Sequence, residues 1–129
     1  MRVMEHYVGL DLSLKQTAIC IVDQTGAILK EDMVPTDPEA ITSFINAHAK
    51  HVVRIGMESG AMSTWLWTEL NKMGQPIICI DARHAKAVLK MQINKSDRND
   101  AVGIARIMQT GWYREVRVKH LDSHAIKGL

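Results

Sequence analysis

Apolar residues along the chain fall into five short runs of strand-like length and composition. They cover residues 7–12, 17–22, 27–34, 52–57 and 76–80, with turn-forming or helix-forming segments between them. Between and after the later runs, apolar positions recur with the 3.6-residue period of a helix. This spacing predicts a helix that starts near residues 36–39 and further helices over residues 61–73, 82–91 and 97–110. The predicted order is three strands followed by alternating helices and strands.

This order predicts an α/β fold built on one mixed five-stranded sheet. Short connections join the first three strands, which therefore form an antiparallel meander. The fourth and fifth strands return through helical crossovers and lie parallel to the first, so the strand order is 3-2-1-4-5 with flanking helices. The first helix starts either at a capping box of Thr36 and Glu39 or at a cap by Asp37, with Pro38 in the first turn.

Two acidic residues lie where neighbouring strands end. Asp11 is near the end of the first strand, and Glu58 directly follows the fourth. Because parallel neighbours end at the same edge of a sheet, we expect these side chains to meet there, where ligand sites form in open sheets. Asp11 shares its strand face with Gly9, which leaves room beside it.

Asp97 and Asp100 add two further carboxylates at the start of the last predicted helix. Both lie on its apolar stripe, which is formed by Ala101, Ile104, Ala105, Ile107 and Met108, whereas Asn99, Gly103 and Arg106 face the opposite way. Carboxylates that face a protein core are costly unless something cationic receives them. The pattern therefore favours a bound cation.

Together, Asp11, Glu58, Asp97 and Asp100 indicate a catalytic metal site with two Mg²⁺ or Mn²⁺ ions. Two-metal nucleases use three or four oxygen-donating side chains to hold ions about 3.5–4 Å apart. Magnesium prefers carboxylates and water, so neither Cys nor His is required.

Each carboxylate also has a purely structural explanation. Asp97 could be an N-cap, with Asp100 interacting favourably with the helix dipole. Glu58 could cap the helix that follows it. Asp11 could pair with one of two lysines, Lys15 and Lys95.

Composition and charge narrow the class of protein. The chain of 129 residues is 47% apolar and 23% charged, as in globular domains, and we expect a cytoplasmic protein without membrane partners. Cys20 and Cys79 lie in apolar runs and are predicted to be reduced core residues.

Charge is unevenly distributed along the chain. Residues 1–82 carry 6 Lys/Arg and 10 Asp/Glu, a net charge of −4, whereas residues 83–129 carry 10 Lys/Arg and 4 Asp/Glu, a net charge of +6. Charge alone favours a solvated basic face. The basic half also suits nucleic-acid binding by Arg83, Lys86, Lys90, Lys95, Arg98 and Arg106.

Aromatic residues close to the last predicted helix allow two interpretations. Trp112 and Tyr113, next to Arg114 and Arg117, could stack on nucleic-acid bases. They could also cover the end of the helix, which we favour.

Three segments resemble the motif blocks of a known family, the DEDD transposases of the insertion-sequence one-ten type, which are related to the Piv DNA invertases. They are residues 7–13 (YVGLDLS), 57–60 (MESG) and 95–101 (KSDRNDA), and the last is the most specific. Residues 81–83 also match the segment that typically follows the fifth strand in that family. The resemblance runs from about residue 6 to residue 119.

The resemblance implies a RuvC-like, ribonuclease H-like catalytic domain over residues 1–119, with Asp11, Glu58, Asp97 and Asp100 as its four acidic residues. It also implies a DNA transposase or recombinase that uses divalent metal ions, a structured guide RNA, and a second domain that supplies a serine nucleophile. Residues 120–129 are then expected to start a truncated helical linker, and the full-length protein is expected to be a homo-oligomer.

Three alternative functions are compatible with parts of this pattern. A stand-alone Holliday-junction resolvase or nuclease would have the same fold. A sugar-kinase or actin-type ATPase also begins with a Gly-x-Asp strand, but it needs a second domain and further phosphate loops. A third alternative is a non-catalytic domain that binds nucleic acid or assembles with itself.

Overall fold

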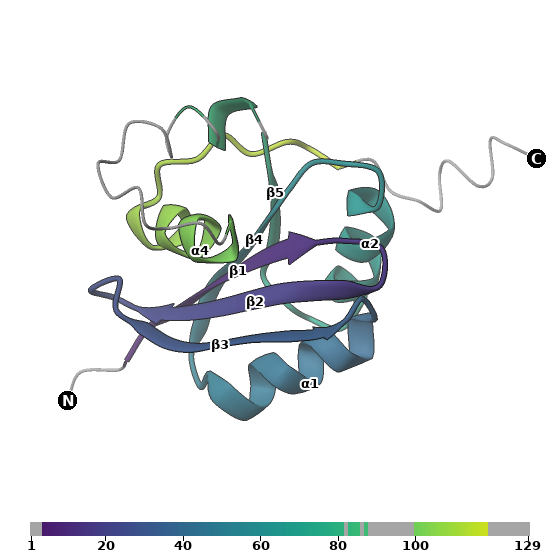
Figure 1. Cartoon of the computed structure of the whole chain (residues 1–129). Coiled ribbons are helices and arrows are strands. Elements are labelled where there is room, and N and C mark those ends of the chain that lie inside the picture. The colour runs from purple at the N-terminus through teal and green to yellow at the C-terminus, as the bar shows by residue number, and fades with distance from the viewer. Residues whose placement is uncertain (1–3, 82, 86, 88–99, 119–129) are drawn as a thin grey trace, which may run out of the picture.

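The computed structural model describes residues 4–81, 83–85, 87 and 100–118. Five strands form one sheet in the order β3-β2-β1-β4-β5, as the sequence predicts (Figure 1). β1 pairs antiparallel with β2 and parallel with β4, while β2 pairs antiparallel with β3, and β4 parallel with β5. The strands are β1 (His6–Leu12), β2 (Gln16–Asp23), β3 (Ile28–Pro35), β4 (Val52–Glu58) and β5 (Ile77–Ile80).

The helices that are described over their whole length flank this sheet: α1 (Pro38–His48), α2 (Ser63–Lys72) and α4 (Asp100–Thr110). At the start of α1, Asp37 Oδ2 accepts a hydrogen bond from Ala40 N at 2.9 Å, so the Asp37 cap forms rather than the capping box. Thr36 Oγ1 instead donates to Ser13 O at 2.7 Å and ties the helix start to the β1–β2 hairpin. Residues 83–85 and 87 are helical, while the remainder of the predicted 82–91 helix lies outside the described residues.

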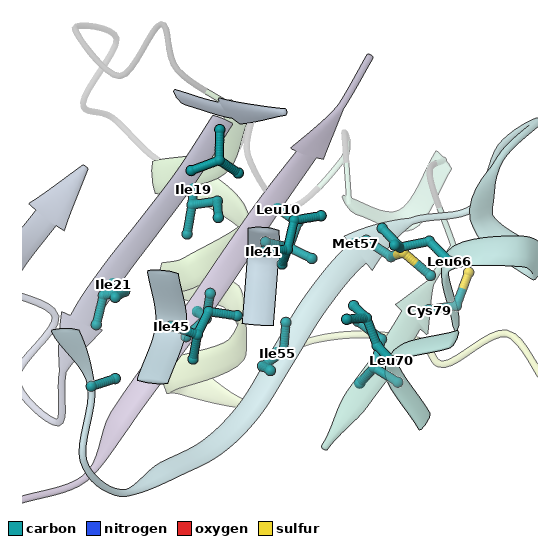
Figure 2. Close-up of a cluster of buried hydrophobic side chains, with 14 residues drawn as sticks. Leu10, Ile19, Ile21, Ile41, Ile45, Ile55, Met57, Leu66, Leu70 and Cys79 are labelled. Atoms are coloured by element: carbon teal, nitrogen blue, oxygen red, sulfur yellow. The ribbon is translucent and has the colours of Figure 1, made fainter. Parts of the chain in front are cut away.

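The larger part of the core lies between the sheet and helices α1 and α2. Alternate residues of the strands point to this side, where α1 and α2 present their own apolar residues (Figure 2). Ten of these buried side chains are labelled in Figure 2: Leu10, Ile19, Ile21, Ile41, Ile45, Ile55, Met57, Leu66, Leu70 and Cys79. Cys79 and Cys20 are both buried free cysteines, which confirms that they belong to the core.

Helix α4 covers the opposite face of the sheet, over β1, β2 and β4. All five residues of its predicted apolar stripe are buried, which confirms the helical periodicity. Gly103 is buried as well, which corrects the prediction that it faces away. Its neighbours Arg106 and Gln109 hydrogen bond to the β2–β3 turn at Gly26 O and Gln24 O, so this turn covers a flank of α4 that carries no apolar signal.

Arg54 of β4 holds the C-terminal end of α4. Its Nε donates to Met108 O at 2.9 Å, and its guanidinium carbon lies 5.3 Å from the Tyr7 ring centroid and 5.7 Å from that of Tyr113. Tyr113 therefore covers the helix end, as one of the two interpretations predicts, whereas Trp112 is 67% exposed.

Residues 114–118 add an extended segment beside β5 that the sequence analysis did not predict. Asp81 N donates to Arg114 O at 2.8 Å and Val116 N donates to Cys79 O at 2.7 Å, in an antiparallel arrangement. Val116 and Val118 alternate with charged residues and pack against the core on the α1 and α2 side. That alternation was the available signal, but it spans too few residues to predict a strand. No helix in the described part of the chain is long and apolar enough to cross a membrane.

Candidate active site at the carboxyl edge of the sheet

The register between β1 and β4 places acidic residues from both strands at one edge. Gly9 aligns with Gly56, and Leu10 aligns with Met57. Side chains alternate between faces along a strand, so Asp11 and Glu58, two residues beyond the two glycines, follow on the face that α4 covers. Glu58 is the last residue of β4, whereas the sequence predicts that this strand ends at Met57.

Asp11 and Glu58 line one pocket of about 270 Å³ at this edge. The turn of residues 59–62 and the first residue of α2 form one wall, and Ile104 of α4 contributes an apolar side chain. The turn keeps its shape through Ser63, whose Oγ donates to Gly60 O at 2.8 Å and accepts from Gly60 N at 3.1 Å. The sequence predicted the two carboxylates of this pocket but not the turn that encloses them.

Asp100, the first residue of α4, is the third carboxylate in this region. It is exposed, and its charge acts on Asp11. Burial and, secondly, the negative charge of Asp100 raise the pKa of Asp11 above its ordinary value. The structure therefore brings Asp11 into electrostatic contact with Asp100, and into a shared pocket with Glu58. Asp97 lies outside the described residues.

Two of the purely structural explanations for these carboxylates do not fit the geometry. Glu58 does not cap α2, because the N-cap position is Met62 and no side chain caps the helix. Among the described residues, Asp11 forms no ion pair with Lys15. Lys95, the other predicted partner, lies outside them. Asp11 is thus a half-buried carboxylate beside a second negative charge, with no cation from the described residues to compensate it.

This chemistry fits a divalent cation, since carboxylates are the side chains that Mg²⁺ and Mn²⁺ prefer. Within the described residues, no three acidic, His or Cys side chains lie close enough together to hold one ion. The fourth predicted ligand, Asp97, is not among those residues. Asp11, Glu58 and Asp100 are the predicted ligands that the structure describes, and these three side chains by themselves do not form a complete site for one ion.

The predicted nucleic-acid-binding residues separate into different regions. Arg83 is exposed and follows β5, whose carboxyl end lies beside that of β4. Arg106 lies at the other edge, where its Nε donates to Gly26 O at 3.3 Å. The other four, Lys86, Lys90, Lys95 and Arg98, lie outside the described residues.

A second pocket of about 280 Å³ adjoins the first and shares Ser59 and Ser63 with it. Arg117, Val116 and Val118 contribute to its walls. It depends on the pairing of residues 114–118 with β5, so sequence reasoning had no means to predict it.

Comparison with solved structures shows the class of fold. The structure of Thermus thermophilus RuvC matches with a TM-score of 0.58 and 10% sequence identity, over 88% of this chain and 100% of that chain. A ROK hexokinase from Thermus thermophilus matches with a TM-score of 0.52 and 18% identity, over 72% of this chain. A ROK family glucokinase from Streptomyces griseus, in complex with glucose and AMPPNP, matches with a TM-score of 0.50 and 17% identity, over 74% of this chain. This chain spans 39% of each kinase. These low identities show a shared fold only, and the fold is RuvC-like and ribonuclease H-like, as predicted.

The comparisons of sequence are more specific. No curated protein matches the chain. A family model described as a transposase, that of the DEDD transposases of insertion-sequence one-ten type, matches residues 8–129. This match covers residues 57–60 and 95–101 and all of the first motif block except Tyr7, and it spans nearly the whole chain. The chain therefore belongs to the DEDD transposase family of the insertion-sequence one-ten type.

Proposed function

We propose that this domain cleaves or exchanges DNA phosphodiester bonds, with Asp11, Glu58, Asp97 and Asp100 holding two Mg²⁺ or Mn²⁺ ions. The observation that carries the proposal is the half-buried Asp11 carboxylate, which lies beside Asp100 and shares a pocket with Glu58. Two neighbouring carboxylates such as Asp11 and Asp100, one of them half-buried, cost stability in a purely structural role, and a divalent cation would compensate their charge.

The division of roles follows from the elements that carry the side chains. Asp11 and Glu58 are held on adjacent parallel strands, so the sheet fixes their separation. Asp100 enters from α4 on the same face. Bound metal ions would stabilise the attacking and leaving oxygens of a phosphodiester. Ile104 and the turn of residues 59–62 would line the space in which the phosphodiester binds.

For the full-length protein, we propose DNA as substrate, a structured guide RNA as partner and a homo-oligomeric state. Family membership supports DNA as the substrate. Exposed Arg83, on the same edge as the carboxylates, supports a role in holding phosphate groups. The guide RNA and the homo-oligomer rest on the family resemblance alone.

Metal titration tests the proposed site directly. Isothermal calorimetry with Mn²⁺ is expected to show binding to the wild type that Asp11→Asn and Glu58→Gln each weaken by at least about tenfold. Asp32→Asn is the matched control, because Asp32 is an exposed acid on edge strand β3, away from the pocket. Equal Mn²⁺ binding by all four proteins would contradict the proposal.

A second candidate is a stand-alone nuclease that acts on branched DNA. It is favoured by the assembly of the carboxylate pocket within one sheet and its helices, without a second domain. Cleavage of a four-way DNA junction by the 129-residue chain, abolished by Asp11→Asn, would support this candidate. Binding of the junction without cleavage would favour a domain that acts only within a larger recombinase.

A further inference from the structure

Helix α4 approaches the sheet more closely at Gly9 than any side chain would allow. A methyl group at position 9 would lie 2.2 Å from Ala101 O and 2.4 Å from Ala105 N. Both distances are far below the roughly 3.5 Å at which non-bonded atoms attract. The two atoms are four residues apart, which is the spacing of one helical hydrogen bond. A backbone that is already hydrogen bonded cannot turn aside as a side chain can, so a methyl group here requires the helix or the strand to move.

Gly56 provides a matched comparison on the neighbouring strand. It is the β4 residue aligned with Gly9 and is covered by the same helix. A methyl group at position 56 would lie 2.7–2.8 Å from Sδ, Cε and Cγ of Met108. Methionine is unbranched and flexible, so its side chain can rotate away without displacement of the helix axis.

The close approach at Gly9 lies beside two of the candidate ligands, Asp11 and Asp100. Gly9 is two residues before Asp11 on β1, and Ala101 directly follows Asp100 on α4. We propose that Gly9 is a positioning residue, which admits the α4 backbone against β1 and thereby sets the distance between the Asp11 and Asp100 carboxylates. Its consequence for metal binding rests on the proposed function, whereas the spacing is a property of the metal-free protein.

The metal-free protein tests the spacing first. Asp100→Asn is expected to lower the pKa of Asp11, because the charge of Asp100 contributes to its rise. Carbon-13 NMR titration of the Asp11 carboxyl measures this change in pKa. In a Gly9→Ala background, Asp100→Asn is expected to change the pKa of Asp11 by less than half as much as in the wild type. In a Gly56→Ala background, Asp100→Asn is expected to change the pKa of Asp11 as much as in the wild type. An undiminished lowering in Gly9→Ala overturns the proposal.

Mn²⁺ calorimetry provides the second measurement. Gly9→Ala is expected to raise the dissociation constant at least about tenfold, and Gly56→Ala less than about twofold, because only the first change displaces a ligand-bearing backbone. Tight binding by the wild type and by Gly9→Ala alike overturns the proposal. Absence of Mn²⁺ binding by the wild type contradicts the proposed function instead, and the NMR measurement still decides the role of Gly9.

A variant at the other end of α4 decides the question if Gly9→Ala does not fold. Arg54→Met removes the hydrogen bond to Met108 O and loosens that end of the helix. The fold is expected to be less stable, but the effect of Asp100→Asn on the pKa of Asp11 is expected to persist, because the contact at Gly9 is intact. Loss of that effect in Arg54→Met would show that the remainder of the interface sets the spacing, which overturns the proposal.

Discussion

Replacement of Ile104 by alanine links the packing of α4 to the electrostatics of the carboxylate pocket. Ile104 is 1% exposed and lines the pocket together with Asp11 and Glu58. Truncation of a buried isoleucine to alanine typically costs 2–5 kcal/mol of unfolding free energy, from lost burial and from the cavity that remains. Alanine has the higher helix propensity, which returns less than about 0.7 kcal/mol. The net effect is therefore a loss of roughly 2–4 kcal/mol.

The second effect of Ile104→Ala concerns Asp11. Burial is the larger cause of the raised pKa of this carboxyl, and a smaller side chain at position 104 admits water to the pocket. The pKa of Asp11 is therefore expected to fall toward its ordinary value. Stability and pKa change together only if Ile104 both packs the core and desolvates the site.

Urea denaturation followed by circular dichroism measures the first effect, and carbon-13 NMR titration of the Asp11 carboxyl measures the second. Leu14→Ala is the control, because Leu14 is 80% exposed and its truncation is expected to change the unfolding free energy by less than about 0.5 kcal/mol. A loss below about 1 kcal/mol in Ile104→Ala, or an unchanged pKa of Asp11, would refute the reasoning.

Substitutions of Asp11, Asp23, Arg83 and Arg106 are expected to change stability or DNA binding. Asp11→Asn is expected to raise the unfolding free energy at neutral pH, because the fold disfavours the charged form of Asp11. Since the pKa of Asp11 is raised, the wild type gains stability as the pH falls through that pKa, and the urea midpoints of the two proteins should converge in acid. The hydrogen bond from the Thr25 hydroxyl is the main cause of the lowered pKa of Asp23, so Asp23 stabilises the β2–β3 turn at pH values above the ordinary pKa of an aspartate. In thermal melts, Asp23→Ala should therefore be less stable than the wild type at pH 7, and this difference should be lost as the pH falls through the lowered pKa. In fluorescence anisotropy titrations, Arg83→Gln is expected to reduce by about one the slope of log affinity for DNA against log salt concentration. Arg106→Gln loses the contact to the β2–β3 turn, so it should lower the melting temperature and leave that slope unchanged.

The sequence by itself determined the order and type of the elements and the sheet topology. Apolar runs with strand periodicity and short turns leave few arrangements for a three-stranded meander, and right-handed crossovers then place β4 and β5 on one side of β1. The same reasoning brings Asp11 and Glu58 to one edge, because parallel strands end together. These are local or topological properties, which period and chain direction are sufficient to predict.

Only the tertiary structure decided how closely α4 approaches the sheet and what the carboxylates contact. Sequence reasoning interpreted Gly9 as leaving room beside Asp11, but the backbone of Ala101 and Ala105 fills the space over Gly9 itself. Only the structure excludes Glu58 as the cap of α2 and shows that residues 114–118 pair with β5. These features depend on contacts between residues distant along the chain, where the fit of two backbones, rather than the period of either, decides the outcome.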